Sequence, residues 1–361
     1  MDIAGAKKVT INQVAEYCGV SKTTISRFLN GKYENMSEET KEKISSAIKE
    51  LNYHPDRSAQ RLKSSKTMLI GCVVGDVSSP FSALLLRGIF SVCEEAGYQV
   101  LLADSHEDPQ REKKAIQGFL ANRVDGLIIN SCGENDEYIL NLREHGVPMV
   151  LADRPLAKPG LIDTVSSTNK ATAKECVRFL FEQGYSSVAF FTQKMGHITT
   201  RLLRCEGYCS GIESYGAQGA EAEIHEFENH NQLDCEEHIK AFINKHPGER
   251  IAILVSNGTS AQTVLCALNN LGIKAGYELG LCTFDNWDWL EISSPGVTAV
   301  ALESVEIGAK SAKLLLDTIS GARSDTDPAN ILVDSSLTVK ESTPGPMGVC
   351  VKNKLMQDLL S

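Results

Sequence analysis

Polar side chains directly follow several apolar runs that the sequence predicts to be strands. Asp153 and Arg154 follow one such run, and Asn257 and Asp285 follow two others. Ligands of parallel sheets bind outside the carboxyl ends of the strands, so these residues are candidates for a binding site. A carboxylate accepts hydrogen bonds from two adjacent hydroxyls and an arginine donates in a planar fork, which suits a polyhydroxylated ligand. Taken singly, each residue also has a structural interpretation as a cap, a turn residue or a surface ion pair.

Motifs for other kinds of chemistry are missing from the sequence. There is no GxSxG elbow, Walker loop, HExxH pair or GxGxxG opening a helix, so we expect no enzyme and a ligand that is returned unchanged. The eleven cysteines include no CxxC pair and no Cys/His zinc spacing, and Cys205 and Cys209 have the i,i+4 spacing of packed helix residues. We therefore expect reduced thiols, no metal and no cofactor.

Charge is unevenly distributed along the chain. The formal net charge is −10, but residues 1–66 carry 12 Lys or Arg against 8 Asp or Glu, and the remainder carries 24 against 38. A small basic segment on an acidic body suits local contact with DNA. The 361 residues allow two or three domains. No run approaches 18 apolar residues and no signal-peptide core precedes the first helix pattern, so we expect a cytoplasmic protein without membrane contact.

Short apolar runs alternate with helical patterns from residue 68 onward. MLIGCVVGDV, YQVLLADS and GLIIN have strand character, and the same rhythm restarts at SVAFFT and continues through AILVSN and LGLCTFDN. Such alternation is typical of right-handed βαβ units and a parallel sheet. The restart predicts two α/β lobes, with a cleft between them, rather than one long sheet.

The beginning of the chain predicts three short helices. Thr10 and Gln13 have capping-box spacing before an amphipathic pattern. Gly19 suits a left-handed turn, Ser21 caps a second helix, and a third begins at Ser37. Together these form a trihelical helix-turn-helix unit, although periodicity alone also allows a small helical bundle with no role in DNA binding.

The residues themselves favour DNA binding. The stretch VTINQVAEYCGVSKTTISRFLNG closely resembles the operator-binding head of the LacI family of bacterial transcription regulators, and NMSEETKEKISSAIKELNYHPDRSAQRLKSSKTMLIG continues the match through the family's hinge. The resemblance implies that the second helix enters the major groove, where Arg can donate two hydrogen bonds to a guanine edge. It implies base contacts from Lys22, Thr23 and Arg27. Residues placed for phosphate contacts, or alternatively for structural roles such as helix caps, are Thr10, Tyr17, Ser21, Ser26 and Asn30.

The family's hinge corresponds to the segment Pro55–Lys63, which reads as a short helix that would be marginal alone in water. By resemblance, two such hinges pair over the minor groove, where Leu62, beside Ala59, wedges between base steps. A flexible linker is the structural alternative, but it would leave a lone leucine exposed among basic residues.

The resemblance covers nearly the whole chain and implies an all-α head plus a two-lobed α/β domain similar to type I periplasmic sugar-binding proteins. The implied parts are a helix-turn-helix domain at 1–54, a hinge at 55–66, an effector-binding and dimerisation domain at 67–341, and a tail at 342–361. In such proteins the chain crosses between the lobes three times. The implied first lobe spans about 67–166 and 299–328, and the second about 167–298 and 329–341.

The resemblance also implies which residues contact an effector. The pattern Arg204-x-x-Gly207-Tyr208 matches the family's ligand-holding arginine, and Asn257 and Asp285 fall where the family contacts sugar hydroxyls. Phe227 could instead pack in the core, and Trp287 could instead anchor the connection between the lobes. The further candidates for effector contact are Phe81, Asp153, Arg154, Arg201, Phe227 and Trp287.

The phrase TFDNWDW resembles the branch of the family that includes the ketodeoxygluconate regulator of pectin catabolism, whose effectors are sugar acids. Lys194, Arg201 and Arg204 could neutralise a ligand carboxylate at the predicted mouth. The resemblance implies a repressor of carbohydrate catabolism genes that responds to a sugar or sugar acid such as a 2-keto-3-deoxygluconate-like compound. The alternatives are a corepressor-dependent regulator with a non-sugar effector and, disfavoured by the lack of an export signal, a sugar-binding protein of a transport system.

Paired hinges need a neighbouring copy, and one head covers only half of a site. We therefore expect a two-fold homodimer on a near-palindromic operator of double-stranded DNA. Lobe closure would alter the separation of the two hinges and hence operator affinity. The closing STPGPMGVCVKNKLMQDLLS lacks the sustained heptads of a coiled coil, so we expect no tetramer through this tail.

Overall fold

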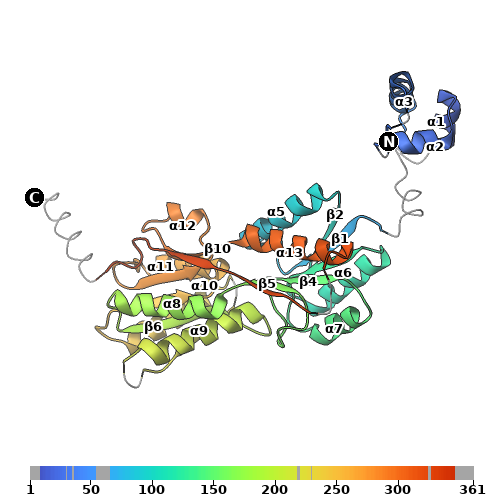
Figure 1. Ribbon diagram of the computed structural model, residues 1–361. Coiled ribbons are helices and arrows are strands. Elements are labelled where there is room, and N and C mark those ends of the chain that lie inside the picture. Colours follow the sequence, from blue (N-terminus) through green and yellow to red (C-terminus); the bar gives the residue numbers. More distant parts are fainter. Residues whose placement is uncertain are drawn as a thin grey trace, which may run out of the picture. The chain divides into compact units, whose positions relative to one another are not determined.

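The computed structural model describes residues 9–29, 31–34, 36–53, 66–217, 220–228, 230–323 and 327–345. The chain divides into two compact units, Met1–Thr67 and Met68–Ser361 (Figure 1). The expected hinge, apart from Lys66, lies outside the described residues, and so do the candidate DNA contacts Asn30, Ala59 and Leu62. No helix among the described residues is both long enough and apolar enough to cross a bilayer.

The described residues of the first unit form three helices, α1 (Ile11–Cys18), α2 (Lys22–Leu29) and α3 (Glu38–Glu50). The capping box predicted for α1 is present, because the Thr10 hydroxyl accepts from the Gln13 amide at 3.4 Å and the Gln13 side chain accepts from the Thr10 amide at 2.8 Å. Gly19 ends α1 with φ 61°, a left-handed conformation that permits the tight turn into α2. The buried core of this unit consists of Val14, Ala15, Cys18, Ile25, Ile44, Ala47 and Tyr53.

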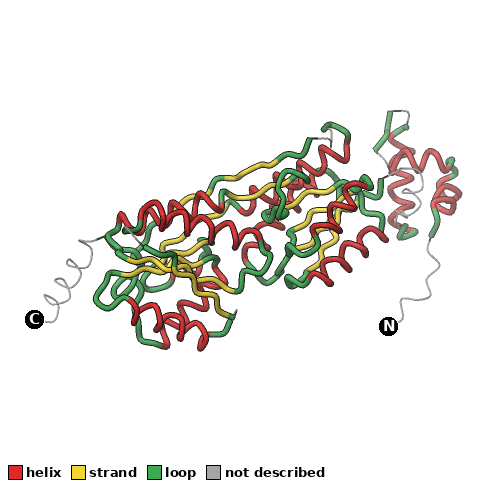
Figure 2. Tube along the Cα trace, turned by 90° about the horizontal axis from the view of Figure 1, so that it is seen from below, coloured by secondary structure: helices red, strands yellow, loops and turns green. Residues whose placement is uncertain are grey.

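In the part of the second unit that the structure describes, two six-stranded sheets are covered by helices on both faces (Figure 2). The first sheet is entirely parallel and has the strand order β11-β5-β4-β3-β1-β2. Its strands are β1 (Leu69–Val74), β2 (Gln99–Asp104), β3 (Gly126–Ile129), β4 (Met149–Ala152), β5 (Thr164–Ser167) and β11 (Asn330–Val333). The helices of this lobe are α5 (Pro80–Glu95), α6 (Pro109–Ala121), α7 (Asp136–Glu144) and α13 (Ser304–Ser320).

The second sheet has the order β12-β10-β9-β8-β6-β7 and is parallel except for β12. Its strands are β6 (Ser187–Gln193), β7 (Glu223–Phe227), β8 (Ile251–Val255), β9 (Gly280–Phe284), β10 (Thr298–Leu302) and β12 (Ser335–Thr338). The helices of this lobe are α8 (Asn169–Glu182), α9 (Thr199–Tyr215), α10 (Gln232–Lys245), α11 (Gly258–Asn270) and α12 (Trp289–Ile292). The central strands β8 and β9 are buried along their whole length, which explains their continuous apolar runs.

The chain passes between the two sheets three times: between β5 and α8, between β10 and α13, and between β11 and β12. Two strands lie in the opposite lobe from the one expected. Most of β10 was expected in the first lobe but pairs with β9 in the second sheet, and β11 was expected in the second lobe but pairs with β5 in the first. The sequence does not show to which sheet a short apolar strand belongs, because pairing with strands distant in sequence decides this.

Two glycines let α5 and α13 pack side by side against the first sheet (Figure 1). A Cβ at Gly88 of α5 would lie 2.0 Å from the carbonyl oxygen of Val305, and one at Gly308 of α13 would lie 2.0 Å from that of Leu85. Because the opposing atoms belong to helix backbone, they cannot move aside as a flexible side chain would. The backbones of the two helices therefore touch at a position where no Cβ fits.

We predict that Gly88→Ala lowers the free energy of unfolding by about 1–3 kcal/mol, since the added methyl group would overpack this contact. Gly118→Ala is the matched control, because Gly118 lies exposed within α6 with nothing near its Cβ position. Alanine there should stabilise the protein by about 0.5–1 kcal/mol. Denaturant unfolding of both variants measures the difference, and equal stability of the two would contradict the backbone contact.

Candidate functional site

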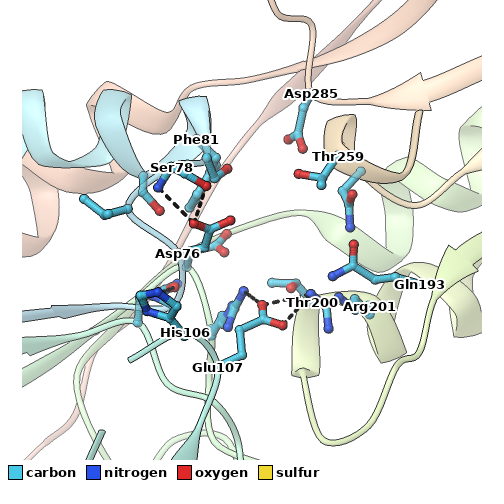
Figure 3. Close-up of a pocket in the computed structure, with 18 of the residues that line it drawn as sticks. Asp76, Ser78, Phe81, His106, Glu107, Gln193, Thr200, Arg201, Thr259 and Asp285 are labelled. Carbon is cyan, nitrogen blue, oxygen red and sulfur yellow. Dashed lines mark hydrogen bonds and ion pairs between the residues drawn. The ribbon is translucent and has the colours of Figure 1, made fainter. Parts of the chain in front are cut away.

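A cavity of about 440 Å³ lies between the two lobes at the carboxyl ends of strands from both sheets (Figure 3). Its lining is polar and comes from both lobes, with Ser78 and His106 on the first and Gln193 and Thr259 on the second. Most residues predicted to contact an effector come together here. Those that line the cavity are Phe81, Asp153, Arg154, Arg201, Arg204, Asn257 and Asp285.

The two remaining effector candidates do not line the cavity. Phe227, at the end of β7, is only 1% exposed and packs in the core of the second lobe, 6.5 Å from the ring of Phe191. Trp287 is 8% exposed and covers Gly258, where a Cβ would lie 2.6 Å from the indole ring. Aromatic side chains gain most from full burial, and Phe227 follows the packing interpretation of its sequence position. Trp287 instead packs against Gly258 of its own lobe, and the expected anchoring of the connection between the lobes is not tested.

Two aspartates occupy matching positions in the two lobes. Asp153 follows β4 and Asp285 follows β9, and each of these strands is third in the order of its sheet. Both residues have a left-handed backbone, with φ 70° and 68°, which is uncommon for residues other than glycine and clusters at functional sites. Asp285 accepts a hydrogen bond from the Gly258 amide at 2.9 Å, whereas Oδ1 of the buried Asp153 has no hydrogen-bond partner. Asp153 therefore presents a free acceptor beside the cavity.

Arg204 is held near these carboxylates, and the charge of each acts on it. This α9 residue is 5% exposed, and its guanidinium lies 4.2 Å from the ring centre of Phe284. Its Nε donates to the Asn169 side chain and its Nη1 to the Ser256 carbonyl, both at 2.7 Å. Burial lowers the pKa of Arg204, against the opposing effect of Asp285 and then Asp153. The cavity is thus lined by a fixed donor and two acidic acceptors, which suits a ligand with several hydroxyl groups.

The buried position of Asp153 makes its charge costly. Burial raises the pKa of Asp153 to about 6, and Asp285 adds to the rise, whereas Arg204, Arg154 and a hydrogen bond from Asn130 oppose it. Burial also raises the pKa of Asp285, again against the effect of Arg204. For both carboxylates, attraction to the neighbouring arginines thus only partly offsets the free-energy cost of removing the charged group from water.

Glu107 is a further residue of the site that the sequence did not reveal. It follows β2, and its carboxylate accepts hydrogen bonds from both arginines (Figure 3). Arg154 Nη2 donates to Oε1 at 2.7 Å, and Arg201 Nη2 donates to Oε1 and Oε2 at 2.8 Å each. The segment SHEDPQRE, which contains Glu107, has the composition of an exposed loop. The only sequence signal for a role in the site was the position of Glu107 after a strand end.

Arg201 and Arg204 line the cavity as expected, whereas Lys194 pairs with Glu228 outside it. Because five carboxylates line the cavity against three arginines, the excess of positive charge expected at the mouth is not found.

The surface of the first unit presents most of the predicted DNA contacts. Lys22, Thr23 and Arg27 are exposed on α2, and Ser26 is half-buried. Thr10 caps α1, and Ser21 accepts from the Thr24 amide at 3.1 Å at the start of α2, so both have structural roles. Tyr17 is 57% exposed and donates to Glu50 of α3 at 2.6 Å. Contacts of these residues with DNA remain predictions.

No group of three or more potential metal ligands is found among the residues that the structure describes.

Both units match family models. Residues 10–56 match bacterial regulatory proteins of the lacI family, and residues 67–341 match the periplasmic binding proteins and sugar binding domain of the LacI family. The chain therefore belongs to the LacI family of bacterial regulatory proteins, as the sequence resemblance predicted.

Individual relatives span nearly the whole chain. The HTH-type transcriptional regulator KdgR of Bacillus subtilis (strain 168) is 32% identical over 334 residues, which is 92% of this chain and 97% of that protein. The sucrose operon repressor of Pediococcus pentosaceus is 32% identical over 318 residues, 87% and 94% of the two chains. The lac repressor dimer bound to operator and the anti-inducer ONPF has a TM-score of 0.81 at 25% identity and covers 94% of this chain and 100% of its own.

We predict that Asp153→Asn removes part of the pH dependence of stability. The folded pKa of about 6 lies above the ordinary value of 3.8, so the contribution of Asp153 to stability is fully present below pH 4 and is lost as the pH rises through 6. The variant should gain on the order of 2–3 kcal/mol relative to wild type between pH 4 and pH 7. Urea unfolding across this range tests the prediction, and parallel curves for the two proteins would refute it.

Proposed function

We propose that this protein is a transcriptional repressor of carbohydrate catabolism genes whose operator affinity changes when a sugar or sugar acid binds between its lobes. The buried cluster of Asp153, Arg204 and Asp285 in the cleft carries the proposal. Such a set of acceptors around one fixed donor suits a polyhydroxylated ligand. The sucrose operon repressor among its relatives supports a carbohydrate effector, and the relation to KdgR supports a sugar acid such as a 2-keto-3-deoxygluconate-like compound.

The first unit is proposed to recognise DNA through α2. Lys22, Thr23 and Arg27 are exposed together there, while the inner face of the same helix packs in the core. Arg and Lys can read guanine edges in the major groove, and Thr can reach either type of base pair. The lac repressor in its operator complex, which covers 94% of this chain, supports the same arrangement. A regulator that reads chromosomal operators acts in the cytoplasm.

A homodimer is proposed to bind a near-palindromic operator, because one helix-turn-helix unit covers only half of a site. The outer face of α5 supports such pairing. Phe90 is 42% exposed there, beside Ala83 and Leu86, in a shallow groove on this helix. A two-fold axis would bring the same face of a second copy against it.

Effector binding is proposed to act by shifting the balance between lobe arrangements. A ligand that prefers one arrangement changes the position of the first lobes within the dimer and thereby the separation of the DNA-binding units. A coupling free energy of about 1–3 kcal/mol corresponds to roughly 5–150-fold in operator affinity, which is enough for regulation. The effector is released unchanged, without catalysis. An effector that tightens operator binding would make the protein a corepressor-dependent regulator instead.

We predict that Arg27→Ala costs about 1–3 kcal/mol of binding to the operator, selected from a random DNA pool, and relaxes specificity at one base pair. Lys49→Ala is the control, because Lys49 is exposed in the last turn of α3, away from the proposed reading helix. Fluorescence anisotropy on operator and scrambled DNA measures both. An equal loss on the two DNAs, or no loss on the operator, would argue against base reading by Arg27.

We predict that Arg204→Gln shifts the response to effector to a higher effector concentration while operator binding persists. The substitution removes a charged donor whose hydrogen bonds contribute about 1.5–3 kcal/mol each, so effector affinity should fall by roughly 10–150-fold. A thermal-shift series with neutral sugars, sugar acids and purine bases identifies the stabilising compound, and operator titrations with it compare variant and wild type. If the variant still responds at the wild-type concentration, the effector binds elsewhere.

A further inference from the structure

The carboxylate of Glu107 connects the two lobes through two arginines. Arg154 follows β4 in the first lobe and donates to Oε1 at 2.7 Å, whereas Arg201 of α9 in the second lobe donates to Oε1 and Oε2 at 2.8 Å each. Figure 3 shows Glu107 lying between the lobes at the edge of the cavity, with its carboxylate toward the arginines. Two guanidinium groups from opposite lobes thus converge on one carboxylate.

Glu107 is the exchangeable member of this trio. Its side chain is 26% exposed, compared with 13% for Arg154 and 9% for Arg201. It stands on the loop between β2 and α6, where His106 and Glu107 both have positive φ, 52° and 55°. Two successive left-handed residues other than glycine are uncommon, and side-chain contacts must hold the loop in this form. The carboxylate can therefore return to water, whereas the arginines behind it stay buried.

The arginines require a negative charge at this place. Burial lowers the pKa of Arg201; Glu107 opposes this effect, and repulsion from Arg154 and Arg204 adds to it. Burial alone would raise the pKa of Glu107, but Arg154 and Arg201 outweigh it and hold that pKa below its ordinary value. The carboxylates of Asp153 and Asp285 act on Arg204, and Asp153 also acts on Arg154. Without Glu107, the other two guanidinium groups would lack the carboxylate that both now contact, at the edge of a cavity of ligand size.

We propose that Arg154 and Arg201 form an anion subsite, which Glu107 fills in the absence of effector and where the carboxylate of an acidic effector takes its place. The inference rests on the proposed role of the cavity as the effector site and specifies its ligand as a polyhydroxylated carboxylic acid. Exchange of one carboxylate for another conserves charge and keeps both lobes connected. A neutral sugar offers no such replacement, so it cannot displace Glu107.

Chemical rescue of Glu107→Ala tests the subsite without knowledge of the natural effector. Acetate, titrated against chloride at constant ionic strength, should raise the melting temperature of full-length Glu107→Ala in a saturable manner. Wild type should show no such effect, because its own carboxylate occupies the subsite. Glu213→Ala is the control, since Glu213 is exposed on the same helix as Arg201 and outside the cavity. If Glu107→Ala gains no more from acetate than wild type does, the proposal fails.

A matched pair of ligands tests the exchange itself. D-Gluconate should bind Glu107→Ala at least about tenfold more tightly than D-sorbitol, which has the same chain with an alcohol in place of the carboxylate, a difference of 1.4 kcal/mol. Sorbitol binding as tight as gluconate binding would overturn the subsite. Glu107→Gln, which keeps the side-chain length without the charge, provides a second variant if alanine prevents folding. Rescue by acetate without any effect of neutral sugars or sugar acids on operator affinity would leave the subsite intact and refute the proposed function.

Discussion

The placement of three guanidinium groups, two buried and that of Arg154 half-buried, in the cleft between two lobes is the constraint on which this site depends. Arg154, Arg201 and Arg204 are each held close to the cavity, and each carries a charge that only nearby carboxylates can compensate. Two of those carboxylates, Asp153 and Asp285, are fixed at equivalent strand ends. The cleft is therefore a network of charges shared by both lobes, and a change at one member alters the balance for the others.

We propose that the fold couples this network to the arrangement of the lobes. The three passages between the sheets join the lobes without a continuous sheet, so the contacts across the cleft contribute directly to their arrangement. Glu107 with Arg201 makes one such contact, and the Thr199 hydroxyl donating to the Pro155 carbonyl at 2.9 Å makes another. A ligand that replaces or reinforces these contacts shifts the arrangement by its differential affinity for the two states. The LacI family places a DNA-binding unit before such a domain, which gives this shift an output on DNA.

Sequence reasoning succeeded where local pattern determines position. Asp153 and Asp285 follow short apolar strands, so their places at the cleft could be predicted from the alternation of strands and helices. Glu107 could not be found, because its role depends on an arginine 94 residues away. The prediction that Phe227 contacts an effector failed for a related reason. Its place at a strand end does not show whether the aromatic ring packs in the core or faces a ligand. The placement of β10 and β11 likewise depended on non-local pairing.

The most direct test of the account is the affinity of the full-length protein for its operator, measured by fluorescence anisotropy across a panel of neutral sugars, sugar acids and purine bases. The account predicts that at least one polyhydroxylated compound, recovered unchanged afterwards, alters the operator Kd by roughly 5–150-fold. A folded protein that binds its operator with the same Kd in every one of these compounds would contradict the coupling between cleft and DNA.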